Sequence, residues 1–275
     1  MDASRITAAI WPWGTNTREE MELAAKEVSE IGYKSFESVK AAIYAFDLDL
    51  NAYRDVLNRY DLKPVSFYFH IPRHEAELEE NFFSNIDKEL EFIAELGVKR
   101  VCLQGSSGRP EEMNEECLEF ELAMVKKFAD KAKEFDIMAN VHPHVNTWIM
   151  YKPEIDNILR NLDCKTVQFA PDTAHLTAAD CDPVAVVKEY VDRVNFTHFK
   201  DIKGLSADSD GWASAGMEVY SNFCELGTGI VDFRSIFDLL KAANYDGPLC
   251  EELDRAPVTN AQSARNNYNF LLNNY

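Results

Sequence analysis

The sequence predicts an α/β fold, a single (β/α)8 barrel of the TIM type that occupies residues 1–275. Short apolar runs recur at a nearly regular interval, and amphipathic segments with helix-start signals lie between them. The first run leads into Trp11-Pro12-Trp13-Gly14, which is not the glycine-rich phosphate turn that an open doubly wound sheet normally has there. A closed barrel is therefore favoured over an open sheet.

Eight apolar runs are expected to form the strands of this barrel. Their starts lie 28 to 37 residues apart, except that 53 residues separate the last two starts. A step of about 30 residues is the length of one βα unit, and eight such units close a barrel. The predicted strands cover residues 5–11, 34–39, 64–70, 100–105, 137–142, 166–172, 194–199 and 247–253.

The segments between the predicted strands carry the signals of helices. Apolar residues with three-four spacing, which share one helical face, mark residues 21–31, 184–194 and 233–240. Thr17 and Glu20 have the spacing of a capping box, so we expect a helix to begin there. Two other side chains are expected to cap helices, namely Asp182, which precedes Pro183, and Asp232.

The one long interval places a loop of residues 203–225 after the seventh strand. In a barrel, the loops that follow the strands lie at the catalytic rim. A loop of this length is usually functional, and a decorative insertion is the alternative.

Charge and composition exclude several classes of partner. The chain has 28 basic and 47 acidic residues and a formal net charge of −19. This surplus disfavours nucleic acids and anionic membranes, because both are polyanions. No apolar stretch approaches the roughly 20 residues of a membrane helix, and the N-terminus lacks the layout of a signal peptide. We therefore expect a cytoplasmic protein that acts on a small molecule.

Histidines and carboxylates gather where the last four predicted strands end, which is where barrel enzymes build their sites. Mixed imidazole and carboxylate ligands suit Mn²⁺, Zn²⁺, Co²⁺ or Fe²⁺. Successive side chains of a strand alternate in direction, so His142 and His144 point the same way, whereas Glu251 and Glu252 point oppositely. The other residues at these ends are Asp172, His175, His198 and Lys200.

Four motifs resemble those of the xylose-isomerase-like barrel superfamily of sugar isomerases, epimerases and dehydratases, and the resemblance covers essentially the whole chain. Each motif is weak alone, but all four occur in the family's order and at compatible spacing. They are Asp172-Thr173-x-His175, His198-x-Lys200-Asp201, Gly227-x-Gly229-x-x-Asp232-Phe233, and Tyr245-Asp246-Gly247 followed by Glu252-Leu253-Asp254-Arg255.

The resemblance implies one divalent metal ion held by side chains from strands five to eight. The motif positions carry over to Asp172, His198 and Glu252, and Glu252 is preferred to Glu251 because it lies five residues after Gly247. Most members have Glu at the strand-five position, where this chain has His142. Either His142 binds the metal, as imidazole does, or the metal has three protein ligands and more water. Mn²⁺ is favoured, with Co²⁺, Zn²⁺, Fe²⁺ and Mg²⁺ as the other candidates.

The same resemblance indicates chemistry next to a carbonyl group. A metal that holds a carbonyl and a neighbouring hydroxyl acidifies the adjacent C–H. Epimerases that resemble this family use two glutamates on opposite faces of the carbon, and here histidine replaces one of them. A histidine can take this proton and give it to a departing oxygen, which favours β-elimination. We therefore predict a lyase acting on a keto-sugar, keto-glycoside or keto-cyclitol, with His144, Glu252 and Lys200 as catalytic residues.

Several alternatives stay open at this level. Inosose dehydratase-like and keto-C-glycoside-cleaving relatives both fit, and some of the latter act with a small partner subunit. The former carry Gly and Glu where this chain has Asn146 and Met150. A ketose 3-epimerase, an aldose–ketose isomerase and a non-catalytic sugar-binding barrel are the other candidates. We expect a carbohydrate substrate and an oligomer, with substrate-binding roles for His175, Glu37, Trp13, Trp148 and His70.

Overall fold

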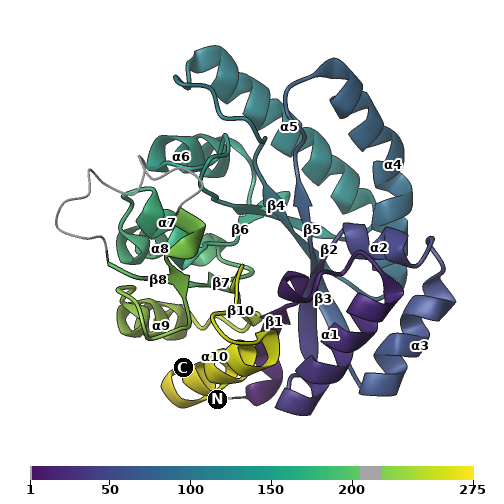
Figure 1. The fold of residues 1–275 in the computed structure, drawn as a ribbon. Helices are drawn as coiled ribbons and strands as arrows, with labels where there is room; N and C mark the ends of the chain where they lie inside the picture. The colour runs from purple at the N-terminus through teal and green to yellow at the C-terminus, as the bar shows by residue number, and fades with distance from the viewer. Residues whose placement is uncertain (1, 205–218) are drawn as a thin grey trace.

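The computed structural model describes residues 2–204 and 219–275, and it confirms the predicted α/β barrel (Figure 1). The strands of the barrel are β1 (Ile6–Ala9), β2 (Ser35–Val39), β3 (Lys63–His70), β4 (Arg100–Gln104), β5 (Met138–His142), β6 (Val167–Phe169), β7 (His198–Phe199) and β10 (Leu249–Glu251). They pair in parallel in the order β6-β5-β4-β3-β2-β1-β10-β7. Parallel bridges from Phe169 to Val194 and from Asp172 to His198 join the two ends of the sheet and close the barrel.

Helices follow the strands and cover the outside of the sheet (Figure 1). Two helices instead of one follow β2 and also β6, which is why the chain has more elements than eight plain βα units would need. These are α2 (Ala41–Ala45) and α3 (Leu50–Tyr60), then α7 (Thr173–Ala178) and α8 (Pro183–Tyr190). The other helices are α1 (Arg18–Ile31), α4 (Ala76–Glu95), α5 (Glu115–Glu134), α6 (Lys152–Asn161), α9 (Phe233–Ala242) and α10 (Asn260–Asn274).

The predicted helix starts are confirmed by their capping contacts. The Thr17 hydroxyl accepts a hydrogen bond from the Glu20 amide at 3.2 Å, and the Glu20 carboxylate accepts one from the Thr17 amide at 3.1 Å. Asp182 and Asp232 likewise accept from amides in the first turns of α8 and α9. These contacts satisfy amide groups that a helix leaves without partners.

Several strands and one helix end earlier than predicted. Trp11–Trp13 forms a 3-10 helix instead of extending β1, since Pro12 has no amide hydrogen for a sheet. Strand β6 stops at Phe169 because Asp172 begins α7, where its Oδ1 accepts from two backbone amides. Helix α8 ends at Tyr190, and Val194 bridges to β6. The apolar spacing over 184–194 thus runs from α8 through the 3-10 helix Val191–Arg193 to Val194, which is also the first residue of the predicted strand 194–199.

The strands divide their side chains between two environments. Val101 and Leu103 of β4 pack in the large core between the sheet and the helices. Cys102, which lies between them, faces the opposite way and packs inside the barrel. Its neighbours there are mostly small, namely Ala9, Ala170, Cys250 and the larger Phe196. Small side chains leave room above them for the polar groups that gather at the carboxyl ends of the strands.

The predicted rim loop of residues 203–225 is described only at its two ends. Short strands β8 (Asp201–Ile202) and β9 (Phe223–Cys224) pair in antiparallel fashion there. Residues 205–218 lie outside the described residues. Among the helices that are described, not one is long and apolar enough to cross a membrane.

Candidate metal centre and active site

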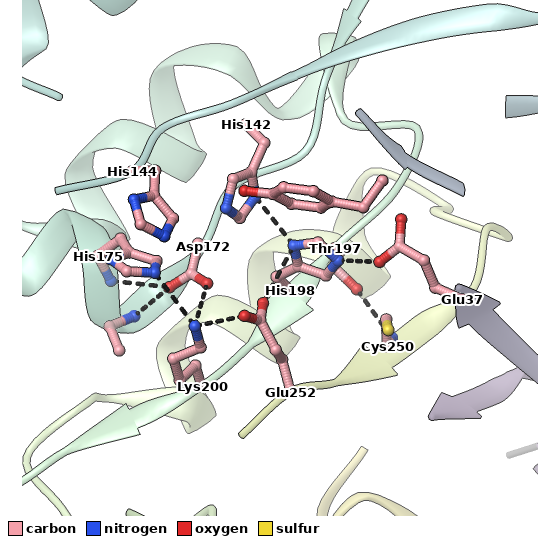
Figure 2. Close-up of polar contacts among 12 residues, drawn as sticks. Glu37, His142, His144, Asp172, His175, Thr197, His198, Lys200, Cys250 and Glu252 are labelled. Carbon is pink, nitrogen blue, oxygen red and sulfur yellow. Dashed lines mark hydrogen bonds and ion pairs between the residues drawn. The ribbon is translucent and has the colours of Figure 1, made fainter. Parts of the chain in front are cut away.

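Four buried side chains meet at the carboxyl ends of neighbouring strands (Figure 2). His142 ends β5, His198 begins β7, Glu252 directly follows β10, and Asp172 caps α7 just after β6. One possible ligand atom from each of the four lies within 4.8 Å of the others. The structure therefore brings together all four of the predicted metal ligands, His142 included.

The hydrogen bonding of this cluster is incomplete in a way that suits a cation. Within the described residues, His142 Nε2, Asp172 Oδ2 and Glu252 Oε2 are buried without a hydrogen-bond partner. Such unsatisfied groups are costly, and a bound cation would satisfy them. His198 Nδ1 lies 3.2 Å from Glu252 Oε2 and 2.9 Å from His142 Nδ1. The nitrogen and oxygen donors thus fit a divalent metal ion.

Two contacts fix the orientation of the ligand side chains. Asp172 uses Oδ1 to accept from the amides of Ala174 and His175, at 2.9 and 2.7 Å, so Oδ2 is left toward the cluster. His198 Nε2 is hydrogen-bonded to Glu37, which lies on the other side of the ring from Asp172 (Figure 2). A proton held on Nε2 by that carboxylate leaves a lone pair on Nδ1, on the cluster side.

Burial dominates the electrostatics of the cluster. It raises the pKa of Asp172 to about 8 and that of Glu252 to about 7, because the charged form loses its hydration. It also lowers the pKa of His142 well below its ordinary value. A divalent cation among these groups would favour the ionised carboxylates and the neutral imidazole, which are the forms that bind metal.

Lys200 lies fully buried beside the cluster. Its Nζ contacts Glu252, lies 2.8 Å from Asp254 Oδ2 and 3.5 Å from Asp172 Oδ2, and is 3.1 Å from His175 Nε2. Burial alone lowers the pKa of Lys200, but the neighbouring carboxylates outweigh it and raise that pKa well above its ordinary value. The neighbouring carboxylates therefore favour the ammonium form of Lys200.

Asp201, the sequence neighbour of Lys200, has a different role. Its carboxylate accepts from the amides of Gly227, Gly229 and Val231 at 2.9, 2.8 and 3.1 Å. A side chain at Gly229 would come within 2.3 Å of Asp201 Oδ1, so this close approach requires glycine. The third sequence motif thus holds the chain after β9 against β8.

His144 lies next to the cluster and lines a cavity of about 830 Å³. Its Nδ1 donates to the Val145 carbonyl at 2.8 Å, and its ring centroid is 3.8 Å from that of His175. Burial, followed by the charge of Lys200, lowers the pKa of His144 to about 4. The imidazole is therefore neutral near pH 7, with a lone pair on Nε2, which lies 3.4 Å from Tyr220 Oη.

The predicted substrate-binding residues divide into two groups. His70 lines the cavity, and His175 packs against His144. Trp13 donates instead to Glu27 at 2.6 Å, and Trp148 donates to the Gly108 carbonyl at 3.2 Å. Neither tryptophan is among the described residues that line the cavity. Both indoles are nearly buried by packing, so their predicted contact with substrate stays a prediction.

Glu37, the fifth of these residues, is fully buried and already paired. Its Oε1 accepts from the Ser66 hydroxyl at 2.6 Å, and its Oε2 contacts His198. The alternation of β10 is confirmed, because Glu251 turns away from the cluster and accepts from Tyr33 and Asn267. From strand position alone, a carboxylate such as Glu37 that holds another side chain in place cannot be distinguished from one that binds substrate.

Some cavity residues were not among the predicted site residues. The Tyr68 hydroxyl donates to Gln104 Oε1 at 2.6 Å, and its ring lies 5.2 Å from that of His142. Tyr68 and His70 lie two residues apart on β3 and so share one face, and Gln104 ends β4, so their strand positions were the available signal. Trp11, from the segment after β1, packs edge-on against His198. Asp254, which contacts Lys200, lies in the fourth sequence motif.

Comparison with known proteins agrees with this architecture. The family model described as "Xylose isomerase-like TIM barrel" matches residues 25–273. The inosose dehydratase of Lactiplantibacillus plantarum is 30% identical over 133 residues, or 47% of this chain and 44% of that protein. The chain thus spans about half the length of this relative. The inosose dehydratase of Clostridium beijerinckii is 25% identical, and the match covers 94% of this chain and 93% of that protein.

Among solved structures, the crystal structure of "IOLI protein with a binding zinc atom" is similar with a TM-score of 0.78. It is 14% identical and the match covers 97% of this chain and 96% of that one. At this identity the similarity bears on the fold, which it confirms.

Proposed function

The chain belongs to the xylose isomerase-like TIM barrel family, and from this premise we propose that it is a divalent-metal-dependent lyase. Its substrate is a keto-sugar, keto-glycoside or keto-cyclitol, which loses the proton next to the carbonyl and a group one carbon further on. The observation that carries the proposal is the union of four buried metal-ligand side chains with the neutral His144 beside them. The relatives named inosose dehydratase support elimination as the reaction.

The metal ion would be held by His142, Asp172, His198 and Glu252, three of which have a buried atom without a hydrogen-bond partner within the described chain. Such an ion, when bound, polarises the substrate carbonyl and makes the adjacent C–H acidic. Two imidazoles and two carboxylates suit Mn²⁺, Co²⁺, Fe²⁺ and Zn²⁺. We propose Mn²⁺ as the first metal to test.

His144 moves the proton in this proposal. Because its Nδ1 hydrogen is held by the Val145 carbonyl, only Nε2 has a lone pair with which to take the proton. The same nitrogen then gives that proton to the departing oxygen, so that the substrate loses water or an alcohol and the enzyme is unchanged. The lowered pKa of His144 favours this return, since the imidazolium is a strong acid there.

Lys200 acts on the substrate oxygen, and Glu252 supports it. The fixed ammonium of Lys200 stabilises the negative charge that develops on that oxygen when the proton leaves. Glu252 holds the ammonium through Oε1 while Oε2 stays toward the metal cluster. His175 Nε2, at 3.1 Å from Lys200 Nζ, would contact a substrate hydroxyl from the same side.

The test is product analysis with the Mn²⁺-loaded enzyme. Keto-inositols, keto-glucosides and free ketoses are incubated in D₂O and followed by mass spectrometry. Loss of water or of an alcohol is the expected result. Deuterium incorporation with isomer formation and without loss would refute the lyase and favour the ketose 3-epimerase or aldose–ketose isomerase. Absence of bound metal and of any turnover would favour a sugar-binding barrel.

The role of His144 is tested by His144→Ala. We expect activity to fall at least about 100-fold, the usual contribution of a positioned acid–base group, with the metal retained. His74→Ala is the matched control, because the His74 side chain is 55% exposed and pairs with Glu79 away from the cavity. Full activity of His144→Ala would contradict the assignment. The oligomer and the partner subunit remain predictions. Light scattering of the purified protein checks the oligomer, and light scattering of complexes purified from a lysate checks the partner subunit.

A further inference from the structure

A second cavity adjoins the active-site cavity, and none of the four clustered side chains lines it. The two have volumes of about 830 and 350 Å³ and share three wall residues, Lys40, Tyr44 and His70. The second cavity lies between α2 and the stretch of α4 from Leu78 to Glu89, and the two helices are neighbours in Figure 1. A ligand that lies beside Glu252 and His144 and extends past the shared residues would therefore enter the second cavity.

One wall of the second cavity carries an unused hydrogen-bond acceptor. Glu89 has only 1% of its surface exposed, and its Oε1 accepts from the Tyr44 hydroxyl and lies 3.7 Å from Lys40 Nζ. Its Oε2 has no hydrogen-bond partner within the described residues. Because a buried carboxylate oxygen without a partner is costly, a hydroxyl donated by a ligand would be favourable there.

The rest of the wall is mixed: Lys40, His70, Asn81 and Asn85 are polar, whereas Tyr44, Pro72, Leu78 and Phe82 form an apolar part that is partly open. Tyr44 and Leu78 are 40% and 41% exposed, which makes them two of the most exposed large apolar side chains that the structure describes. Phe82 lies behind them, with the Lys40 ammonium 4.8 Å from its ring centroid. A planar aromatic ring would cover these groups and remove apolar surface from water.

The combined size of the two cavities also favours a substrate larger than a single sugar ring. Pockets of about 300–1,000 Å³ bury ligands of drug size, and a single sugar or cyclitol ring is much smaller than that. The metal cluster, His144 and Lys200 need to contact only that one ring. The space beyond Tyr44 is then available to a second group on the same substrate.

We propose that the cavity between α2 and α4 is a subsite for a hydroxylated aromatic aglycone, so that the substrate is a keto-glycoside rather than a free keto-sugar or keto-cyclitol. The inference rests on the proposed function, because it places the keto-sugar ring beside His144. Glu89 accepts from the aglycone hydroxyl, and Leu78 and Tyr44 contact its ring.

The test measures binding rather than turnover. Methyl, phenyl and 4-hydroxyphenyl β-D-glucosides lack a keto group and do not react, so their affinities for the Mn²⁺-loaded protein are measured by isothermal titration calorimetry. We expect phenyl to bind about tenfold more tightly than methyl, as partial burial of a ring implies. We expect the 4-hydroxyl to add several-fold more, about the worth of one hydrogen bond to a carboxylate.

Two variants assign these gains to the subsite. Leu78→Ala should reduce the phenyl-over-methyl preference several-fold, and Glu89→Gln should remove the gain from the 4-hydroxyl, since a neutral amide is the weaker partner. Leu272→Ala on α10 is the matched control, because Leu272 is also 41% exposed but lies outside both cavities. Equal affinities for the three glucosides, including no measurable binding, would overturn the inference, as would variants that behave like the control.

The outcome is separable from that of the proposed function. An aryl preference without turnover of any keto-substrate would leave the subsite standing and refute the lyase. Turnover of free keto-sugars without any aryl preference would support the lyase and refute the subsite.

Discussion

Replacement of Glu37 by glutamine should weaken metal binding although Glu37 is not one of the four clustered ligands. Its carboxylate is fully buried, accepts from Ser66 at 2.6 Å and holds His198 by Nε2. This contact keeps the proton on Nε2 and the lone pair of Nδ1 toward the cluster. An amide holds that tautomer less strongly, because it is a weaker and uncharged acceptor.

The size of the effect follows from the number of groups involved. One contact to one of four clustered side chains is changed, and the other three keep their positions. Loss of such a supporting partner typically lowers metal affinity by about 10- to 100-fold, which is about 1–3 kcal/mol. The fold should survive, since glutamine has the same shape and can still bond to Ser66.

The measurement is Mn²⁺ affinity by competition with a chelator, with metal content of the purified protein as a second readout. Glu121→Gln is the matched control, because Glu121 is also buried and accepts from a serine hydroxyl, Ser106, at 2.6 Å, but lies outside the cluster. An unchanged affinity in Glu37→Gln, or an equal loss in Glu121→Gln, would refute the positioning role.

Three other predictions concern charge. Lys200→Met should reduce kcat at least about 100-fold and should also lower the melting temperature, because neighbouring buried carboxylates lose their counter-charge; normal kcat would exclude the proposed role. Burial raises the pKa of Glu121 to about 7 from an ordinary 4.5, so the folded state binds more protons than the unfolded state. Its contribution to stability is full below about pH 4.5 and is lost as the pH rises through about 7, by about 3 kcal/mol. Urea unfolding should show a shallower decline over this range in Glu121→Gln, and identical curves would contradict the assignment. Arg109→Ala should destabilise the protein by about 1–3 kcal/mol, because the buried Glu154 keeps only the amides of Met150 and Tyr151 as partners; thermal unfolding measures this, and a change below about 1 kcal/mol would show that the pair is not important.

Local physics made much of the fold predictable. Strand and helix positions follow from apolar periodicity, and the starts of α1, α8 and α9 follow from side chains that bond to amides two or three residues away. The ends of elements were less predictable. Val194 fits both the spacing of the helix before it and the start of the predicted seventh strand, and its pairing with Phe169, on a distant strand, decides between the two.

The candidate ligands were also within reach of the sequence, but their surroundings were not. Motif positions indicated Asp172, His198 and Glu252, while nothing in the sequence could decide whether His142 would join them. That answer needs the distance between β5 and β7, which lie 56 residues apart in sequence and meet through His142 and His198. The same is true of Glu37, which reaches His198 across the barrel.

The sequence by itself thus determined the repeat of strands and helices, the capped helix starts and the set of chemistry-bearing side chains at the strand ends. Only the tertiary structure decided which of those side chains face one another, that Trp13 and Trp148 hydrogen-bond to protein groups, and that a second cavity lined by Glu89 adjoins the first at Tyr44. The reason is range: periodicity and capping act within a few residues, whereas a buried site is assembled by contacts between strands far apart in the chain.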